Sequence, residues 1–194
     1  MKRKIALSAL LCVPVSMTWV ASGQNVTVQL DPVQTKILWT LPAVLHTVHG
    51  TFQLNSGAMT FNTQTGAASG LFTVNENSGQ SGDNTRDGRM KKSILKTAEY
   101  PTATFQPTHV AGSFHASGGS NLTVNGIFQL YGADHPLQLD FQVNTTDKVV
   151  MATAKFNIPY VAWGMHDPST LFLRVDKSVR MEIDAKGIVQ PSKK

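Results

Sequence analysis

Cysteine is almost absent from this chain. Its 194 residues include one cysteine, Cys12, which lies inside the apolar N-terminal run from Ile5 to Val15. Once that run is removed with a secretory signal, the chain has no thiol, which excludes disulfides, thiolate metal sites and cysteine nucleophiles. The remaining chain must be held together by its hydrophobic core, and about 170 residues are enough for one such core in a single domain.

A long apolar run is lacking as well, because the stretch from Ile5 to Val15 is too short to cross a bilayer. Three cations precede it at positions 2–4, and Ala21-Ser22-Gly23 follows it. This order of a basic start, a short apolar run and small residues is typical of a cleaved secretory signal. We expect residues 1–23 to be the signal peptide and residues 24–194 to be a single-domain, periplasmic or secreted chain.

Excess positive charge is small once the signal is set aside. The signal holds three of the 17 Lys and Arg residues, so 14 remain against 12 Asp and Glu residues, a net charge of +2. A chain so close to neutral is not expected to bind nucleic acid. Its cations are nevertheless unevenly placed, because five of the 14 lie between Arg86 and Lys96.

Alternation of apolar and polar residues dominates the chain after the signal, and it is typical of half-buried antiparallel strands. Turn-forming groups such as Asn55-Ser56-Gly57 separate the runs. A sheet with about eight to ten such strands usually closes on itself, which predicts an all-β, antiparallel barrel of about eight strands. The expected strands cover residues 48–54, 59–61, 71–74, 103–105, 110–114, 122–130, 137–143, 149–158, 171–175 and 179–183.

The inner face of the predicted barrel carries small residues at several positions, among them Gly50, Gly112 and Gly126. A packed core would have leucine or isoleucine there, so these glycines favour an interior that holds one elongated ligand. The same glycines could instead mark bulges or bends that curve the strands. The sequence leaves both interpretations open.

One segment departs from the strand pattern. Met90 and Ile94 are four residues apart, with Leu95 beside Ile94, which predicts a short helix near residues 86–96 with one apolar face. Asp83 or the asparagine after it can cap the N-terminus of this helix.

Four segments of the chain match a known family in the family's order: "LHTVHGTFQLNSGAMTFN", "SGDNTRDGRMKKSILKTAEYPTATF", "LTVNGIFQLYGADHPLQL" and "VAWGMHDPSTLFLRVDKSVRMEID". They resemble the YceI-like family of periplasmic polyisoprenoid-binding proteins. The resemblance implies a lipocalin-like, extended antiparallel β-barrel with an apolar channel for a long isoprenoid chain, export to the periplasm, and no established catalytic activity. The loop from Tyr131 to His135 departs from the family's usual Thr- and Lys-containing loop, which weakens the case for head-group contacts there.

A polyisoprenoid needs an apolar tunnel for its tail and, in its carrier forms, positive charge for a phosphate head. We expect Arg86 and Arg89 to bind phosphate oxygens at the barrel mouth, with the apolar face of the short helix turned into the tunnel. The alternative is that an Arg86–Asp87 pair only fixes the loop. The expected ligand-binding residues are Arg86, Asp87, Arg89, Met90, Ile94, Phe52, Phe61, Phe105, Phe128, Trp163, His166 and Phe172.

Histidines raise the enzyme and metal alternatives. His46 and His49 would lie on opposite faces of a strand, so a shared metal ion is not expected. His166-Asp167 could be a base with its orienting carboxylate, but no cysteine and no serine elbow supplies a nucleophile. We therefore expect no enzymatic activity, no metal and no cofactor.

The function expected from the sequence is a periplasmic carrier that sequesters a long-chain polyisoprenoid or prenylated quinone-like lipid. Its partners would be that lipid, a membrane surface in transient contact, and a second copy of the chain in a homodimer. The alternatives are an envelope stress or interaction protein with a packed barrel, and a small hydrolase that uses His135 or His166.

Overall fold

The computed structural model describes residues 24–171 and 173–190. The predicted signal peptide, residues 1–23, and Phe172 lie outside the described residues. The described residues form nine strands and one short helical segment: β1 (Asn25–Leu30), β2 (Lys36–Leu41), β3 (Val48–Asn62), β4 (Ala68–Gln80), α1 (Asn84–Arg89), η1 (Met90–Leu95), β5 (Thr102–Gly112), β6 (Gly118–Leu130), β7 (Ala133–Thr146), β8 (Val149–Ile158) and β9 (Val179–Gln190).

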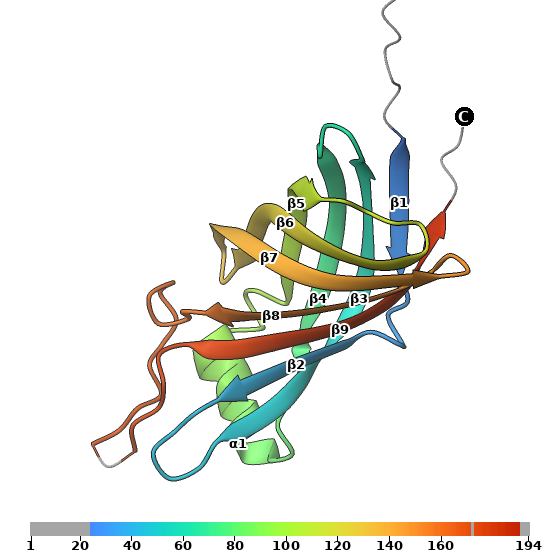
Figure 1. The fold of residues 1–194 in the computed structure, drawn as a ribbon. Helices are drawn as coiled ribbons and strands as arrows, with labels where there is room; N and C mark the ends of the chain where they lie inside the picture. Colours follow the sequence, from blue (N-terminus) through green and yellow to red (C-terminus); the bar gives the residue numbers. More distant parts are fainter. Residues whose placement is uncertain (1–23, 172, 191–194) are drawn as a thin grey trace, which may run out of the picture.

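The nine strands close into an antiparallel barrel with eight positions (Figure 1), because β1 and β2 share one position. Both pair with β3 on one side and with β9 on the other. Every other strand pairs with its sequence neighbour, from β3 through β9. A closed barrel leaves no unpaired sheet edge. The predicted all-β barrel of about eight strands is confirmed.

Two of the strands are longer than the alternation suggested. The predicted turn at Asn55-Ser56-Gly57 is wrong, because β3 runs through it with a register shift between Leu54 and Ser56. The Cβ of a larger residue at position 57 would come within 2.6 Å of the Phe72 ring, so glycine allows that ring to cross the strand. In the same way, β5 joins two predicted strands through a shift between Pro107 and His109. A bulge lets one long strand bend with the barrel.

The predicted strand at residues 171–175 is not present among the described residues. Val175 forms only an isolated bridge to Ala43, and the chain around it is a loop. Leu171 is 86% exposed, whereas Leu173 is half-buried. Local alternation predicted a strand here, but β9 begins only at Val179.

The predicted short helix is confirmed, with a start two residues earlier than expected. Asp83 caps it, since its Oδ1 accepts a hydrogen bond from the Arg86 backbone N–H at 2.9 Å. The first part is α-helical and the second, from Met90, is π-helical. Lys96 ends the segment in the left-handed conformation, with φ of 49°. Figure 1 places α1 near the lower end of the barrel and the first and last described residues at its upper end.

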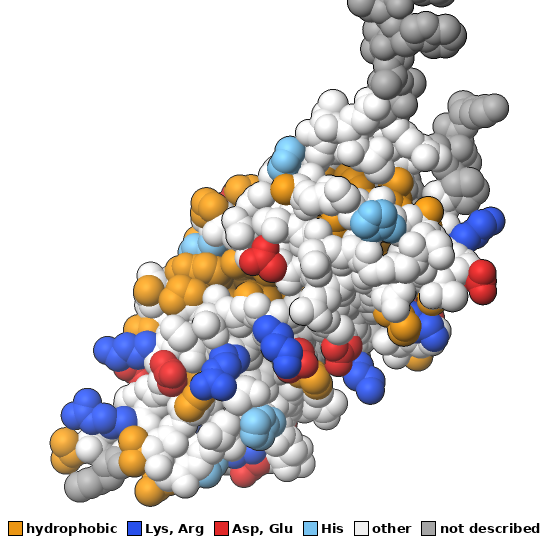
Figure 2. All heavy atoms as spheres, viewed as in Figure 1, with side chains coloured by type: hydrophobic (Ala, Val, Ile, Leu, Met, Phe, Trp, Pro, Cys, Tyr) orange, Lys and Arg blue, Asp and Glu red, His pale blue; other side chains and the backbone are white. Residues whose placement is uncertain are grey.

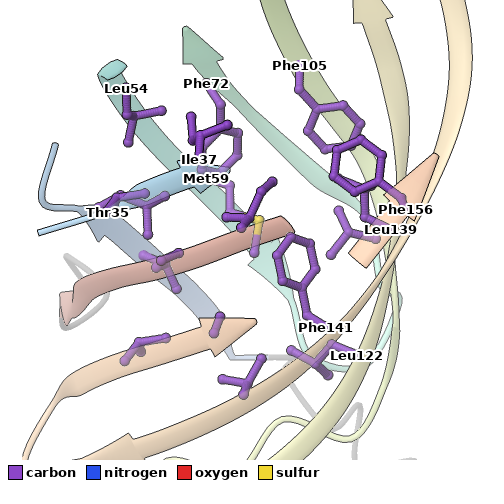
Figure 3. A pocket seen from close by; sticks show the side chains of 18 of the residues that line it. Thr35, Ile37, Leu54, Met59, Phe72, Phe105, Leu122, Leu139, Phe141 and Phe156 are labelled. Carbon is purple, nitrogen blue, oxygen red and sulfur yellow. The ribbon is translucent and has the colours of Figure 1, made fainter. Parts of the chain in front are cut away.

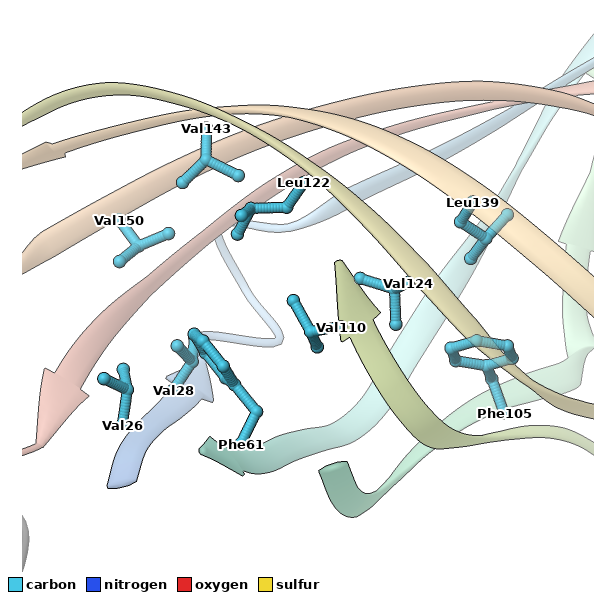
Figure 4. Close-up of a cluster of buried hydrophobic side chains, with 10 residues drawn as sticks. All are labelled: Val26, Val28, Phe61, Phe105, Val110, Leu122, Val124, Leu139, Val143 and Val150. Carbon is cyan, nitrogen blue, oxygen red and sulfur yellow. The ribbon is translucent and has the colours of Figure 1, made fainter. Parts of the chain in front are cut away.

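The buried side chains form two clusters inside the barrel. One includes Val26, Val28 and Phe61 near the described chain ends (Figure 4). The other surrounds Trp39 and Met181 and reaches the apolar side chains of η1. Since the strands alternate, each cluster draws on the inward residues of many strands at once.

Two of the inward glycines accommodate aromatic rings. A Cβ on Gly50 would come within 2.3 Å of the Trp39 ring, and one on Gly126 within 2.6 Å of the Phe105 ring. The absence of a side chain at these positions therefore lets the ring of the neighbouring strand lie across the backbone. It does not leave empty space, which corrects the ligand-space interpretation of Gly50 and Gly126.

The outer surface mixes charges of both signs. On the face shown in Figure 2, Lys and Arg side chains are interspersed with Asp and Glu side chains. One exposed ion pair, Lys155–Glu182, joins β8 to β9 with an N–O distance of 3.0 Å. This face agrees with the small net charge calculated from the sequence.

Candidate functional site

The barrel interior contains an apolar chamber of about 140 Å³ (Figure 3). Phe61, Phe105 and Phe128, three of the predicted ligand-binding residues, lie in its wall. Thr35 is a polar member of the lining, and its hydroxyl is already occupied by the backbone of Lys186. The other lining residues are Val28, Leu30, Ile37, Leu54, Met59, Phe72, Val74, Phe114, Leu122, Val124, Leu137, Leu139, Phe141, Val143, Val150, Ala152, Phe156, Ile183 and Ala185.

A second and larger chamber, of about 600 Å³, lies towards the helical end of the barrel. We call it the mixed chamber because ionisable side chains join its apolar wall. Its volume is in the range of small-molecule sites, about 300–1,000 Å³. Its lining is Trp39, Leu41, Ala43, His46, Val48, Phe52, Glu76, Asp83, Thr85, Arg86, Arg89, Met90, Ser93, Ile94, Leu95, Phe128, Leu130, Ile158, Tyr160, Met165, His166, Pro168, Leu173, Val175, Val179 and Met181.

Phe128 lines both chambers, so the two meet at its ring. This places the apolar chamber and the mixed chamber end to end inside one barrel. A long ligand can therefore extend from the apolar chamber into the mixed chamber, with its polar end in the mixed chamber, when the Phe128 side chain moves aside.

The short helix faces the mixed chamber as the sequence predicted. Met90, Ile94 and Leu95 all belong to its lining, and so do Arg86 and Arg89. The helical spacing brings these side chains to one side, while Lys92 and Lys96 are exposed to solvent. The arrangement combines an apolar wall with two guanidinium groups.

Arg86 and Asp87 are joined through Ser81. The buried Asp87 carboxylate accepts hydrogen bonds from the Ser81 backbone N–H, at 2.9 Å, and from the Ser81 hydroxyl. Arg86 donates from Nε to the same hydroxyl at 2.7 Å and from Nη2 to the Ser81 carbonyl at 3.1 Å. The pair therefore holds the turn before α1. Asp87 is not part of the mixed-chamber lining, whereas Arg86 is.

Glu76 is a wall residue of the mixed chamber that the sequence analysis missed. It is 5% exposed, and within the described chain its Oε2 has no hydrogen-bond partner. Burial raises the pKa of its carboxyl group to about 7. Phe72 and Val74 occupy the same inward phase of β4, so extending the alternation by one step would have placed Glu76 inside the barrel.

Trp163 lies beside the barrel wall and lines neither of these chambers. Its indole stacks on the His135 imidazole with ring centroids 3.9 Å apart, and its ring centroid is 6.1 Å from that of Phe128. Tyr160, in the same loop, donates its hydroxyl to the Asp176 carbonyl at 2.7 Å, and burial raises its pKa to about 12. These contacts indicate that the loop after β8 closes over the barrel end.

His166 lines the mixed chamber but is otherwise exposed. The neighbouring Asp167 Oδ1 accepts a hydrogen bond from the Ser169 backbone N–H at 2.9 Å, and hydrogen bonding to Ser169 lowers the pKa of that carboxyl. The carboxylate is thus directed to Ser169, which gives no support to a His166–Asp167 catalytic pair. Across residues 24–171 and 173–190, no group of three His, Cys, Asp or Glu side chains could hold a metal ion.

Neither helical part of the described chain is long and apolar enough to cross a membrane. The described tips of two loops do expose large apolar side chains, namely Val44, Leu45 and Leu171, which are 73%, 75% and 86% exposed. These loops lie together, since the Val44 backbone N–H donates to the Arg174 carbonyl at 3.1 Å.

Solved structures show the same fold at low sequence identity. A Burkholderia cenocepacia protein, BcnA, has a TM-score of 0.66 and 16% identity, over 81% of this chain and 98% of its own. A Saccharophagus degradans polyisoprenoid binding domain, described as implicated in plant cell wall breakdown, has a TM-score of 0.65 and 15% identity, over 84% of this chain and 98% of its own. A Campylobacter jejuni YceI protein has a TM-score of 0.52 and 11% identity, over the full length of both chains.

A comparison with curated proteins gave no match. The family model described as the YceI-like domain matches residues 28–187. That match covers every strand of the barrel at least in part, from β1 to β9, together with both chambers. The chain therefore belongs to the YceI-like family.

Proposed function

We propose that this protein binds a long-chain isoprenoid-type lipid outside the inner membrane and shields its tail from water. The observation that carries the proposal is the apolar chamber, whose wall is hydrophobic apart from Thr35. An apolar cavity of this size and lining stays dry, so an alkyl or prenyl chain can enter without displacing bound water. The description of the Saccharophagus degradans neighbour as a polyisoprenoid binding domain supports the same ligand class.

The tail of the lipid would fill the small apolar chamber and continue along the apolar wall of the larger mixed chamber, and its head would lie at the helical end of the mixed chamber. Burial of a tail is worth roughly 0.8 kcal/mol per CH₂, so a few prenyl units supply most of the affinity. The head would meet polar groups at the helical end, where Arg86 and Arg89 remain the predicted contacts of any phosphate. Because Arg86 is also bonded to Ser81, Arg89 is the arginine with more freedom to move towards a ligand.

The loop tips that expose Val44, Leu45 and Leu171 would touch the membrane surface when lipid is exchanged. Leu173 and Val175, which follow Leu171 along the chain, line the mixed chamber. A lipid that leaves the bilayer beside these tips would therefore have a short path into the barrel. We further propose that the mature chain, residues 24–194, works in the periplasm as one lipid-binding domain and not as an enzyme.

Organic extraction of the purified protein followed by mass spectrometry tests the proposed function. We expect about one prenyl lipid or prenylated quinone per chain. Protein that contains no extractable lipid and does not bind a fluorescent prenyl probe would overturn the proposal and favour a packed interaction protein instead.

A further inference from the structure

Glu76 is an unusual residue for the wall of a lipid chamber. It lies in β4 and is 5% exposed, and its Oε2 has no hydrogen-bond partner within the described chain. Its backbone N–H is held by the Pro101 carbonyl at 3.0 Å, so the strand fixes its position. A buried polar group without a partner is costly, and one that faces a cavity is a candidate for contact with a ligand.

Trp39 provides a second, independent observation in the same chamber. Its Nε1–H is also buried without a hydrogen-bond partner in the described chain. The indole is held in place, since it is 5% exposed and fits against Gly50 on the neighbouring strand. The wall of the mixed chamber thus contains one buried donor, of Trp39, and one buried carboxyl oxygen, of Glu76, that no hydrogen bond of the described chain uses.

The other ionisable groups of this chamber do not pair with Glu76. Burial alone accounts for the raised pKa of Glu76, with no nearby charge contributing. Asp83 caps α1, Arg86 is bonded to Ser81, and Tyr160 is bonded to Asp176. The remaining ionisable groups of the lining are His46, Arg89 and His166.

We propose that Glu76 and Trp39 bind an uncharged, hydroxyl-bearing head group of the lipid. A hydroxyl can accept from the Trp39 Nε1–H or donate to the Glu76 carboxyl, and it can do so whether that carboxyl is neutral or ionised. A phosphate would bring further negative charge towards a buried carboxyl, which low dielectric makes unfavourable. This inference rests on the proposed lipid-binding function and specifies the head group.

Two chemical sources share this hydroxyl chemistry, a prenyl alcohol and a prenylated phenol. Competition binding with three probes tests the proposal: geranylgeraniol, geranylgeranyl phosphate and squalene, which has a prenyl chain but no head group. We expect the wild-type protein to bind the alcohol about tenfold more tightly than the phosphate. A prenylated phenol in a fourth titration identifies which of the two sources is preferred.

Single substitutions test the contributions of Glu76 and Trp39 to head-group binding separately. Glu76→Leu should lose about tenfold in affinity for geranylgeraniol and keep its affinity for squalene. Trp39→Phe should lower the affinity for geranylgeraniol a few-fold and leave the affinity for squalene unchanged. Glu76→Gln should keep the affinity for geranylgeraniol and gain affinity for geranylgeranyl phosphate. Glu182→Gln, which alters a glutamate of the exposed ion pair, is the matched control and should match the wild type.

The outcomes separate this inference from the proposed function. If the wild-type protein binds none of the probes, the proposed function fails. If it binds squalene and geranylgeraniol but prefers the phosphate, or if Glu76→Leu weakens squalene and alcohol alike, only the Glu76 and Trp39 head-group site is overturned. Glu76→Gln is close to the native side chain in shape, so it keeps the test valid even if Glu76→Leu alters the fold.

Discussion

The indole of Trp163 lies parallel to the imidazole of His135, with ring centroids 3.9 Å apart and an interplanar angle of 5°. The stack joins the loop after β8 to the start of β7. Phe128, which lines both chambers, lies behind it with its ring centroid 6.1 Å from that of Trp163. Trp163 therefore supports the wall at the point where the two chambers meet.

Replacing Trp163 by alanine should lower the free energy of unfolding by about 2 kcal/mol, because a large aromatic contact and its stacking are lost. Urea unfolding measures this, with Val33→Ala as the control at a side chain that is 92% exposed. Unchanged stability combined with a large loss of lipid affinity would instead identify Trp163 as a direct ligand contact.

Glu76 should make stability depend on pH. Its pKa is raised from 4.5 to about 7 in the folded chain, so the folded state holds a proton that the unfolded state has released. Stability from this group is therefore greatest below pH 4.5 and is lost as the pH rises through 7, by up to about 3 kcal/mol in total.

Urea unfolding of wild type and Glu76→Gln at pH 5 and pH 8 checks that sign. The wild type should lose more stability between pH 5 and pH 8 than the variant does, since glutamine does not titrate. The other ionisable groups of the chamber, His46, Asp83, Arg86, Arg89, Tyr160 and His166, are unchanged in this comparison. Identical pH profiles would show that Glu76 is ionised in the folded state at both values.

Alanine at Arg89 should weaken the binding of geranylgeranyl phosphate about tenfold and leave squalene unaffected, because a charge-assisted contact is lost. Arg86→Ala should weaken binding of the phosphate less than Arg89→Ala does and should also lower the stability, since Arg86 holds Ser81. Competition titrations check this, with Lys92→Ala as the exposed cationic control. Equal loss for the charged and uncharged ligands would contradict a contact to the head group.

Filling the apolar chamber should block the lipid tail. Ala152 lines that chamber, and Ala152→Phe introduces a ring into a space of about 140 Å³. We expect squalene affinity to fall by tenfold or more, on the order of 1.4 kcal/mol, with a modest loss of stability from overpacking. Ala111→Phe, at an exposed position of β5, is the control. Full squalene binding by Ala152→Phe would exclude this chamber as the tail site.

Serine at Val44, Leu45 and Leu171 together should reduce binding to vesicles of phosphatidylethanolamine and phosphatidylglycerol. Each side chain is at least 73% exposed, so the substitutions remove membrane contacts without disturbing the core. Vesicle co-sedimentation measures the loss, and Val33→Ser is the exposed apolar control. Unaltered sedimentation of the triple variant would argue against these loops as the contact surface.

Local pattern determined much of the barrel. Alternation alone predicts the inward phase that carries Phe61, Phe105 and Phe128, because a strand places every second side chain on the same face. The four-residue spacing of Met90 and Ile94 likewise predicts the apolar face of the short helix. Both signals depend on neighbours in the sequence, so no tertiary information is needed to find them.

Other features depended on residues that are distant in the sequence. The turn expected at Asn55-Ser56-Gly57 is part of β3, because pairing with β4 keeps the strand extended through a bulge. Trp163 meets His135 only because the start of β7 and the loop after β8 lie at the same end of the barrel.

The sequence by itself determined the fold class, a helix start capped by Asp83 or the asparagine after it, and the residue types of the barrel wall. Only the tertiary structure decided that β1 and β2 share one barrel position and that Ser81 joins Arg86 to Asp87. It also decided that Glu76 faces a chamber with no partner for its Oε2 within the described chain. The physical reason is that burial and hydrogen-bond partnership depend on which strands meet across the barrel, whereas alternation and capping depend on residues a few positions apart.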